Sequence, residues 1–372
     1  MTSLPATRFP SGVCTDVRVL IDGLPITGSS LAIVVEHLLE GWRQDAPQDE
    51  LHLVVGPHAE LAVADDITVH AMPFGRIGGL SRVRHQTFTI PRLARSLDAD
   101  VVVGVLPTTS QSPLPCPRVV IAYDLRHELR PEQFSRANRI QRRFSYRWKQ
   151  ADAIACISDR TRQDLLRSRP WLADRPVEVT HLGGDHVDDW PAPDANDDYA
   201  LAFGQYGNKN VDLVIDAWKL LADRGQARTL RIVGLGGPVR EVVEERLESL
   251  GLTDLVTAMP WLSEEEFRTV FTGANLIVFP SDFEGFGLPA VEAMRRGTPV
   301  AITPEAALLE VTDGHAEVMD GWDAQALADA VERVADWDDD RIVTARQHAE
   351  QFTWARTARQ LRELITRVVP PQ

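Results

Sequence analysis

From position 281 the chain reads Ser281-Asp282-Phe283-Glu284-Gly285-Phe286-Gly287-Leu288-Pro289-Ala290-Val291-Glu292-Ala293-Met294. The apolar run at 275–279, just before it, is typical of a buried strand. Pro289 suits the first position of a helix, and Gly297 suits the position just after one. The stretch therefore predicts a strand, a glycine-rich turn and a short helix, with Glu284 before the helix and Glu292 in its first turns.

The predicted turn has the properties of a ligand-binding turn. Its glycines let the backbone approach a ligand closely, and the free N–H groups of a helix N-terminus carry a partial positive charge that suits phosphate. Seven residues separate Glu284 from Glu292, so one ligand could contact both carboxylates at different ends. For two isolated glutamates the alternative is structural: Glu284 caps a turn and Glu292 faces solvent.

Strands and helices alternate outward from this stretch. β-Branched runs predict strands at 17–21, 51–55, 67–71, 100–104, 118–122 and 153–157, and then at 199–203, 230–233, 255–258, 275–279 and 299–302. Helical spacing predicts helices at 31–42, 81–97, 135–150, 159–168, 211–224, 238–250, 263–272 and 289–296. Alternation on this scale implies parallel sheets that are covered on both faces.

A polar, proline-containing linker at 184–198 divides the alternation into two series. We therefore expect an α/β protein with two Rossmann-like domains, at 1–183 and at 199–351. Their parallel sheets should face each other across a central cleft, which is the usual place for a ligand.

Composition argues against several classes of protein. The chain has 372 residues, 44% of them hydrophobic, and no apolar run of membrane-spanning length. Residues 1–10 lack the apolar core of a signal peptide, so we expect a cytoplasmic protein. The cysteines Cys14, Cys116 and Cys156 fit neither a disulfide framework nor a metal-ligand spacing, and we interpret them as buried structural thiols.

The net charge of −15 comes from the second half of the chain. Up to Thr180 there are 22 basic and 20 acidic residues, and after it there are 17 and 34. Nucleic acid binds proteins through neutralisation of its phosphates, so such an acidic domain is a poor partner for it. We expect no nucleic acid partner.

The stretch at 281–294, followed by Thr298-Pro299-Val300, resembles the signature of the retaining nucleotide-sugar glycosyltransferases of glycosyltransferase family 4, whose fold is GT-B. The resemblance implies that the donor lies mainly on the second domain, with Glu284 on the sugar hydroxyls and Glu292 on the ribose. It implies that the last segment, 352–372, is a helix that crosses back to the first domain. The turn residues whose backbone N–H groups would contact phosphate and sugar are Gly285, Phe286, Gly287 and Leu288.

A second motif follows the predicted strand at 199–203 and reads Gly204-Gln205-Tyr206-Gly207-Asn208-Lys209-Asn210. It resembles the family's phosphate loop, in which basic residues neutralise the donor diphosphate. The resemblance implies that Lys209 binds the diphosphate, with Gly204 and Asn208 beside it. Gln205 or Asn208 stands where many relatives carry arginine, so the positive charge at this loop is reduced or comes from elsewhere.

Two further segments resemble family segments whose backbone forms the wall of the nucleobase site. They follow the predicted strands at 230–233 and 255–258, and their residues are Val233, Gly234, Pro260, Trp261 and Leu262. Each match is weak alone, because glycines after a strand usually mean a tight turn. Trp261 could equally belong to the core.

The first domain departs from the family pattern at two places. Gly28 and Ser29 open a helix where relatives use a glycine pair to approach the donor phosphates; a simple helix N-cap is the equal alternative for Ser29. Tyr123 stands where relatives often place a histidine that contacts the donor sugar, and it can donate a hydrogen bond but will not charge near neutral pH. Ser158 is interpreted as a structural helix cap.

The segment 126–149 is rich in arginine. Along the helix predicted at 135–150, a basic stripe should lie beside an apolar one. The basic stripe is Arg139, Arg143 and Arg147, and the apolar stripe is Ile140, Phe144 and Trp148. Such a helix could lie on an anionic membrane or meet a negatively charged or polysaccharide acceptor. We favour an ordinary amphipathic helix with its polar face in water or turned to the acidic domain.

Taken with the resemblance, these features predict a retaining glycosyltransferase that moves a sugar from a nucleotide diphosphate donor to a hydroxyl of a saccharide acceptor and forms an α-glycosidic bond. The first expectation is an α-mannosyltransferase of the actinobacterial kind, which would use GDP-mannose in polysaccharide biosynthesis. The leaving phosphate is the expected proton acceptor. The residues assigned to catalysis are Glu284, Lys209 and Tyr123.

We expect no cofactor and no metal, because no aspartate pair lies in a metal-site context and backbone with a basic side chain can hold a diphosphate. Two alternatives remain. One is an epimerase or phosphorylase with the same fold. The other is a non-catalytic relative that binds a nucleotide sugar or a partner protein, and the departures at Ser29, Tyr123 and Asn208 are its support.

Overall fold

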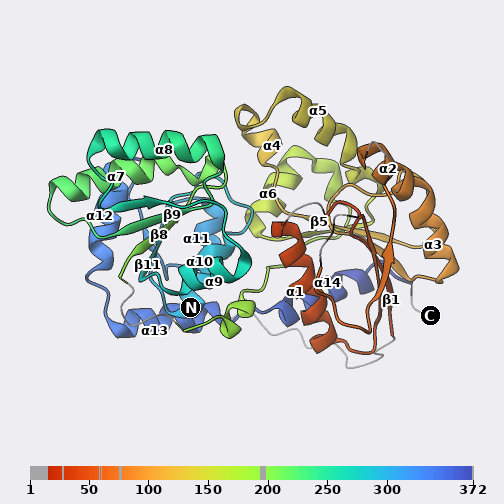
Figure 1. The fold of residues 1–372 in the computed structure, drawn as a ribbon. Helices are drawn as coiled ribbons and strands as arrows, with labels where there is room; N and C mark the ends of the chain where they lie inside the picture. The colour runs from red at the N-terminus through yellow and green to blue at the C-terminus, as the bar shows by residue number, and fades with distance from the viewer. Residues whose placement is uncertain are drawn as a thin grey trace.

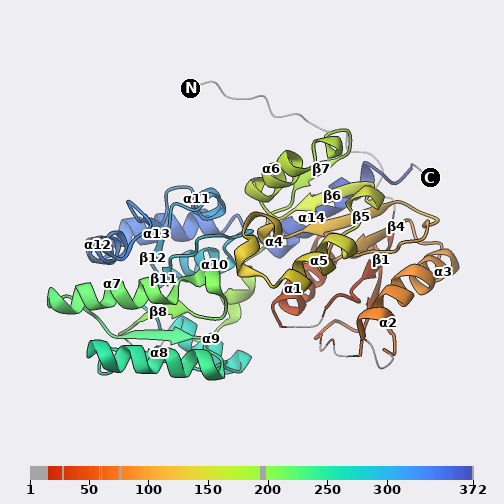
Figure 2. The ribbon, with the colours of Figure 1, turned by 90° about the horizontal axis from the view of Figure 1, so that it is seen from above.

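The structure is a computed structural model, which describes residues 16–26, 29–57, 59, 61–74, 78–192 and 198–370. Two sheets of parallel strands, one in each half of the chain, carry helices on both faces (Figure 1). Seen from above, the two halves stand side by side, and the last helix lies among the elements of the first half (Figure 2). The predicted α/β class with two sheets of parallel strands is confirmed.

The first sheet has seven strands in the order β3-β2-β1-β4-β5-β6-β7. The strands are β1 (Arg18–Asp22), β2 (Glu50–Val55), β3 (Thr68–Ala71), β4 (Val101–Gly104), β5 (Arg118–Ala122), β6 (Ala153–Cys156) and β7 (Val177–Val179). The helices are α1 (Ser29–Asp45), α2 (Gly78–Arg84), α3 (Ile90–Ser96), α4 (Arg126–Leu129), α5 (Arg136–Ser145) and α6 (Asp159–Ser168). Successive residues of β5 pack into cores on opposite faces, which explains why this strand reads as a continuous apolar run.

The second sheet has six strands in the order β10-β9-β8-β11-β12-β13. The strands are β8 (Ala200–Phe203), β9 (Leu230–Val233), β10 (Val256–Ala258), β11 (Leu276–Phe279), β12 (Val300–Ile302) and β13 (Glu317–Val318). The helices are α7 (Val211–Asp223), α8 (Gly237–Leu250), α9 (Glu264–Thr272), α10 (Leu288–Arg296), α11 (Ala306–Thr312), α12 (Ala324–Val334), α13 (Asp339–Ala349) and α14 (Trp354–Thr366).

The strand order reverses direction once in each sheet. In the second sheet the chain moves outward from β8 to β10 and then continues on the other side of β8 with β11. The loops 204–210 and 280–287 therefore leave neighbouring strands and diverge, and ligands of such sheets bind at this reversal. In the first sheet β1 and β4 flank the equivalent point.

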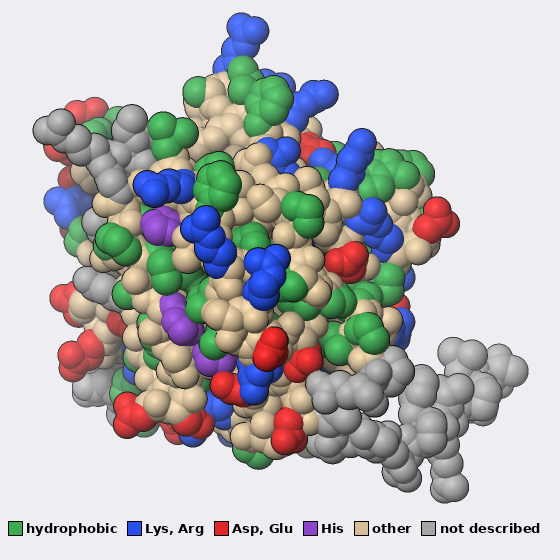
Figure 3. Space-filling model, turned by 90° about the vertical axis from the view of Figure 1, so that its right-hand side faces the viewer, with side chains coloured by type: hydrophobic (Ala, Val, Ile, Leu, Met, Phe, Trp, Pro, Cys, Tyr) green, Lys and Arg blue, Asp and Glu red, His purple; other side chains and the backbone are tan. Residues whose placement is uncertain are grey.

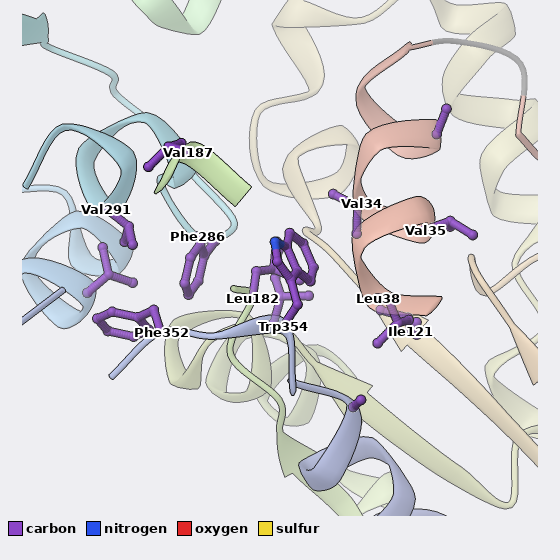
Figure 4. Close-up of a cluster of buried hydrophobic side chains, with 14 of the residues drawn as sticks. Val34, Val35, Leu38, Ile121, Leu182, Val187, Phe286, Val291, Phe352 and Trp354 are labelled. Carbon is purple, nitrogen blue, oxygen red and sulfur yellow. The ribbon is translucent and has the colours of Figure 1, made fainter. Parts of the chain in front are cut away.

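The hydrophobic core is continuous between the two halves. Figure 4 shows Trp354 and Leu182 between Phe286 on one side and Val34 of α1 on the other. Ion pairs hold α14 to the first half: Arg359 pairs with Asp45 at 2.7 Å, and Arg362 pairs with Asp49 at 2.7 Å.

Two predicted helices are wrong in extent. The helix predicted at 81–97 is divided into α2, a π-helical turn (His85–Thr89) and α3, which has a proline in its first turn. The helix predicted at 135–150 ends at Ser145, because Tyr146 is extended and bridges to Thr108. The edge strands β7 and β13 were not predicted, since three and two residues are too few to show a period.

The early end of α5 changes the interpretation of the arginine-rich segment. No residue of α5 is buried, and the side chains of Ile140 and Phe144 are exposed. Arg147 and Trp148 lie outside the helix, so the two predicted stripes are shorter. On the face of the first half that Figure 3 shows, Lys and Arg side chains are spread among hydrophobic ones. Of the described helices, none is both long and apolar enough to cross a membrane.

Candidate functional site

The two motifs of the second half meet where the strand order reverses. Lys209 Nζ lies 2.7 Å from Glu284 Oε1, and both side chains are nearly buried. The Ser281 hydroxyl lies 2.6 Å from the same Glu284 oxygen, and Asn208 Nδ2 donates to it at 3.2 Å. Lys209 also lies over the ring of Phe279 at 4.1 Å. The lysine is therefore not a solvent-facing residue at a helix start, and its ammonium is fixed by the carboxylate.

Glu292 belongs to a different cluster from Glu284. It lies on α10 and is buried, and its Oε1 lies 3.1 Å from Nε2 of His186 in the segment between the two sheets. The indole N–H of Trp354 donates to His186 Nδ1 at 3.1 Å, so Nε2 carries the proton and donates to Glu292. His186 stacks on His37 of α1 at 4.5 Å between ring centroids. Glu292 is thus joined to the first half through two histidines.

The glycine-rich turn lies against the first half. A Cβ atom on Gly285 would come 2.1 Å from the carbonyl oxygen of Tyr123, so only glycine fits at this contact. Gly287 has φ +100°, a left-handed conformation that favours glycine, and a Cβ there would meet Leu308 at 2.4 Å. Phe286 is buried against Phe352, so its side chain belongs to the core, as the close-up shows (Figure 4).

Tyr123 meets the turn through its backbone. Its carbonyl accepts a hydrogen bond from the Thr161 hydroxyl at 3.0 Å. Its phenol oxygen is buried with no hydrogen-bond partner, and the ring lines a small apolar space with Ile121 and Trp354. Burial raises the pKa of this phenol above its usual value. The hydroxyl would have to move before it could contact a donor sugar.

The loops after β8, β9 and β10 run side by side. The N–H of Gly204 donates to Val233 at 2.8 Å, that of Gly234 donates to Pro260 at 3.2 Å, and that of Leu235 donates to Met259 at 3.1 Å. Trp261 is 58% exposed, so it does not belong to the core. The residues Val233, Gly234, Pro260, Trp261 and Leu262 thus line one edge of the second sheet.

Two arginines of the first half reach these motifs, and sequence reasoning missed both as site residues. Arg126, the first residue of α4, donates through Nη1 to Asn208 Oδ1. Arg160 of α6 donates to the carbonyl of Glu284 at 3.2 Å and pairs with Glu305. The position of Arg126, three residues after Tyr123 in the sequence, was the available signal.

A carboxylate of the second half caps a helix of the first. Glu310 of α11 accepts hydrogen bonds from the backbone N–H groups of Asp159 at 2.7 Å and Arg160 at 3.0 Å, and from His181 Nε2 at 2.8 Å. Burial raises the pKa of Glu310, but these hydrogen bonds outweigh it and hold the pKa below its usual value. The prediction that Ser158 caps α6 is confirmed, since it accepts from the backbone N–H of Thr161.

Gly28 lies outside the described residues, as does Cys14; Ser29 is the first residue of α1, and its side chain is not described. Cys156 is buried and Cys116 is partly buried, both as free thiols. Within the described ranges, no group of three or more His, Cys, Asp or Glu side chains is placed to hold a metal ion.

The reversal point of the first sheet holds a buried carboxylate, Asp22, at the end of β1. It accepts hydrogen bonds from Gln86 Nε2 at 2.8 Å and from the backbone N–H of Leu24 at 3.3 Å. Burial raises the pKa of Asp22 to about 6, and the hydrogen bonds oppose this only in part. Gln86 also donates to the carbonyl of Thr108 at 2.8 Å, so Asp22 and Gln86 together connect three segments.

Asp22 predicts a pH dependence of stability. The pKa of Asp22 is higher in the folded than in the unfolded chain, so between these two pKa values the folded state binds more protons. The free energy of unfolding therefore falls as the pH rises through this range. Relative to that of Asp22→Asn, the free energy of unfolding of the wild type should fall by about 2 kcal/mol between about pH 4 and pH 7. Denaturant unfolding of both proteins at the two pH values measures this, and a difference that stays constant would contradict it.

Part of the chain is similar in sequence to known glycosyltransferases. Residues 191–349 match the model of a family described as Glycosyl transferases group 1. D-inositol 3-phosphate glycosyltransferase from Corynebacterium urealyticum is 34% identical over 169 residues, which cover 42% of this chain and 39% of that protein. Mannosylfructose-phosphate synthase from Agrobacterium fabrum is 30% identical over 182 residues, which cover 44% and 39%. The chain thus spans about two fifths of the length of these relatives.

Solved structures match over nearly the whole chain. Sucrose-phosphate synthase from Thermosynechococcus elongatus has a TM-score of 0.70 at 17% identity and covers 94% of this chain and 98% of its own. HepE from Anabaena in complex with UDP and glucose has a TM-score of 0.68 at 16% identity and covers 94% and 100%. At these identities the likeness shows the fold alone, and the predicted GT-B fold is confirmed.

Proposed function

We propose that this chain is a retaining glycosyltransferase, which moves a sugar from a nucleotide diphosphate donor to a hydroxyl of a saccharide acceptor and forms an α-glycosidic bond. The observation that carries the proposal is the buried group of Lys209, Asn208, Ser281 and Glu284 at the reversal point of the second sheet. This group lies within the residues that match the glycosyltransferase family model. A cation and a carboxylate held side by side suit a ligand that has a diphosphate next to sugar hydroxyls.

The proposed reaction needs no dedicated base. The acceptor oxygen bonds to the anomeric carbon on the face that the nucleotide leaves, and the bond from that carbon to the phosphate oxygen breaks. The acceptor proton passes to the leaving phosphate. Lys209 stabilises the charge that develops on the diphosphate, and Glu284 orients the sugar by accepting hydrogen bonds from its hydroxyls.

Donor and acceptor remain proposals within this class. GDP-mannose is our first donor, as the family resemblance led us to expect, and UDP sugars are the alternative that the complex of HepE with UDP and glucose supports. For the acceptor, the names of the relatives add inositol phosphate and a fructose phosphate to the polysaccharide that we expected.

Proton NMR of donor turnover tests the reaction. Each donor is incubated with each acceptor class, and the anomeric signal of the product is followed over time. We expect consumption of one donor and a product with the α configuration. An inverted product, or isomerisation of the donor sugar with no transfer, would contradict the proposal.

Glu292→Ala tests the ribose contact. In the proposed complex Glu292 exchanges its hydrogen bond with His186 for the ribose hydroxyls, so the loss should weaken binding of the nucleotide by about 1–3 kcal/mol. The control is the 2′,3′-dideoxy form of the same nucleotide in a calorimetric titration. The wild type should prefer the ribose form and the variant should not. Equal affinity of wild type and variant for the ribose form would remove Glu292 from the site.

A further inference from the structure

The loop 204–210 lacks the positive charge that a diphosphate needs. Lys209 is its one basic residue, and Glu284 already pairs with it at 2.7 Å. The pair is close to neutral as a unit, whereas a nucleotide diphosphate brings about two negative charges into a nearly buried place, which is costly without a cationic partner. A second cation near Lys209 would therefore strengthen binding of the proposed donor.

Arg126 is in the right place to supply this charge. Helix α4 lies at the boundary between the two halves in both ribbon views (Figures 1 and 2). Arg126 donates to Asn208 Oδ1, and Asn208 donates in turn to Glu284 Oε1 at 3.2 Å. A short chain of hydrogen bonds thus connects the guanidinium of the first half to the Glu284–Lys209 pair of the second.

Aromatic rings position the guanidinium of Arg126. It lies 5.3 Å from the ring centroid of Phe134 and 5.7 Å from that of Tyr206. Tyr206 belongs to the phosphate-loop motif itself. A guanidinium held over aromatic rings keeps the N–H groups at its edge free to bind phosphate oxygens.

The charge of Arg126 is not neutralised. In the part of the chain that the structure describes, it forms no ion pair with a carboxylate, and its buried Nε has no hydrogen-bond partner. Arg160 differs, because it pairs with Asp164 at 2.5 Å and with Glu305. Arg160 therefore holds the two halves together, whereas the charge of Arg126 is available to bind an anion.

We propose that Arg126 binds the diphosphate of the donor from the first half, and so replaces the arginine that the loop 204–210 lacks. This inference rests on the proposed function. The guanidinium exchanges its bond to Asn208 for charge-assisted hydrogen bonds to phosphate oxygens. Because Lys209 and Arg126 come from different halves, the diphosphate then bridges them and favours their approach.

Calorimetric titration of Arg126→Gln tests the inference. The probes are GDP, UDP, dTDP and ADP, and the corresponding nucleosides, which lack phosphate. We expect the variant to bind the diphosphate at least tenfold more weakly and the nucleoside as the wild type does. The affinity of Arg126→Lys for the diphosphate should lie between those of the wild type and Arg126→Gln, because lysine keeps the charge but lacks the planar guanidinium. The matched control is Arg136→Gln on the exposed helix α5, which should bind like the wild type.

A rescue experiment distinguishes two roles of Arg126: binding phosphate, and holding the two halves together. Gln205→Arg in the Arg126→Gln background places a guanidinium on the loop itself and should recover most of the affinity for the diphosphate. Arg126→Gln that binds the diphosphate within twofold of the wild type would overturn the inference and leave the proposed function standing. A wild type that binds none of GDP, UDP, dTDP and ADP would overturn both.

Discussion

Lys209→Met should lower the free energy of unfolding by about 3 kcal/mol, because it leaves the Glu284 carboxylate nearly buried without its cation. The side chains of Lys209 and Glu284 are 9% and 14% exposed, so water can compensate only in part. Lys209→Met/Glu284→Gln should regain most of the lost stability, since the neutral amide no longer needs a cation. Denaturant unfolding of the wild type, the two single variants Lys209→Met and Glu284→Gln, and the double variant gives a double-mutant cycle for this pair.

The double variant should regain stability but should not regain nucleotide binding or donor turnover. Neither a thioether nor an amide can neutralise phosphate, so nucleotide affinity should stay at least tenfold below that of the wild type, and donor turnover should be lost. A stable double variant that turns over donor at the rate of the wild type would show that the ion pair is structural alone.

Gly285→Ala should reduce donor turnover by about 100-fold, since a shift of the turn by about an ångström misplaces the groups that contact the sugar. The added Cβ would come 2.1 Å from the Tyr123 carbonyl oxygen and 3.2 Å from Ile157. Backbone cannot yield there as a flexible side chain would, so the two halves must separate locally. Overpacking of this kind also costs about 1–3 kcal/mol of stability.

Gly79→Ala is the matched control for this substitution, because nothing lies within 4 Å of a Cβ atom at Gly79. It should leave turnover unchanged and should not lower stability, because alanine favours a helix more than glycine does. Steady-state kinetics with a fixed donor, together with the midpoint of thermal unfolding, measures both effects. Full activity of Gly285→Ala would mean that the contact between the turn and Tyr123 has no part in the reaction.

The fold could be predicted from the sequence because strands of a parallel sheet and the helices between them have distinct hydrophobic patterns. Buried strands such as β5 are continuous apolar runs, and helices with regular spacing separate them. The prediction of a helix at 135–150 failed because a contact elsewhere in the fold decided the local structure. Tyr146 ends α5 by bridging to Thr108, and no pattern within 135–150 reports that bridge.

The candidate site was predictable in part. The strand-turn-helix motif and the loop after β8 gave Glu284 and Lys209, which the structure brings within 2.7 Å. The contact between Glu292 and His186 joins residues 106 positions apart, and Arg126 reaches Asn208 across 82 positions. Such pairs depend on how the two halves meet, which local periodicity does not record.

Titration of the wild type with GDP, UDP, dTDP and ADP, followed by the same titration of Lys209→Met/Glu284→Gln, tests the central claim most directly. We predict that one nucleoside diphosphate binds the wild type well above the others, and that the double variant loses at least tenfold in affinity for it. A folded wild type that binds none of the four would contradict the assignment of a nucleotide-sugar site to this pair of residues.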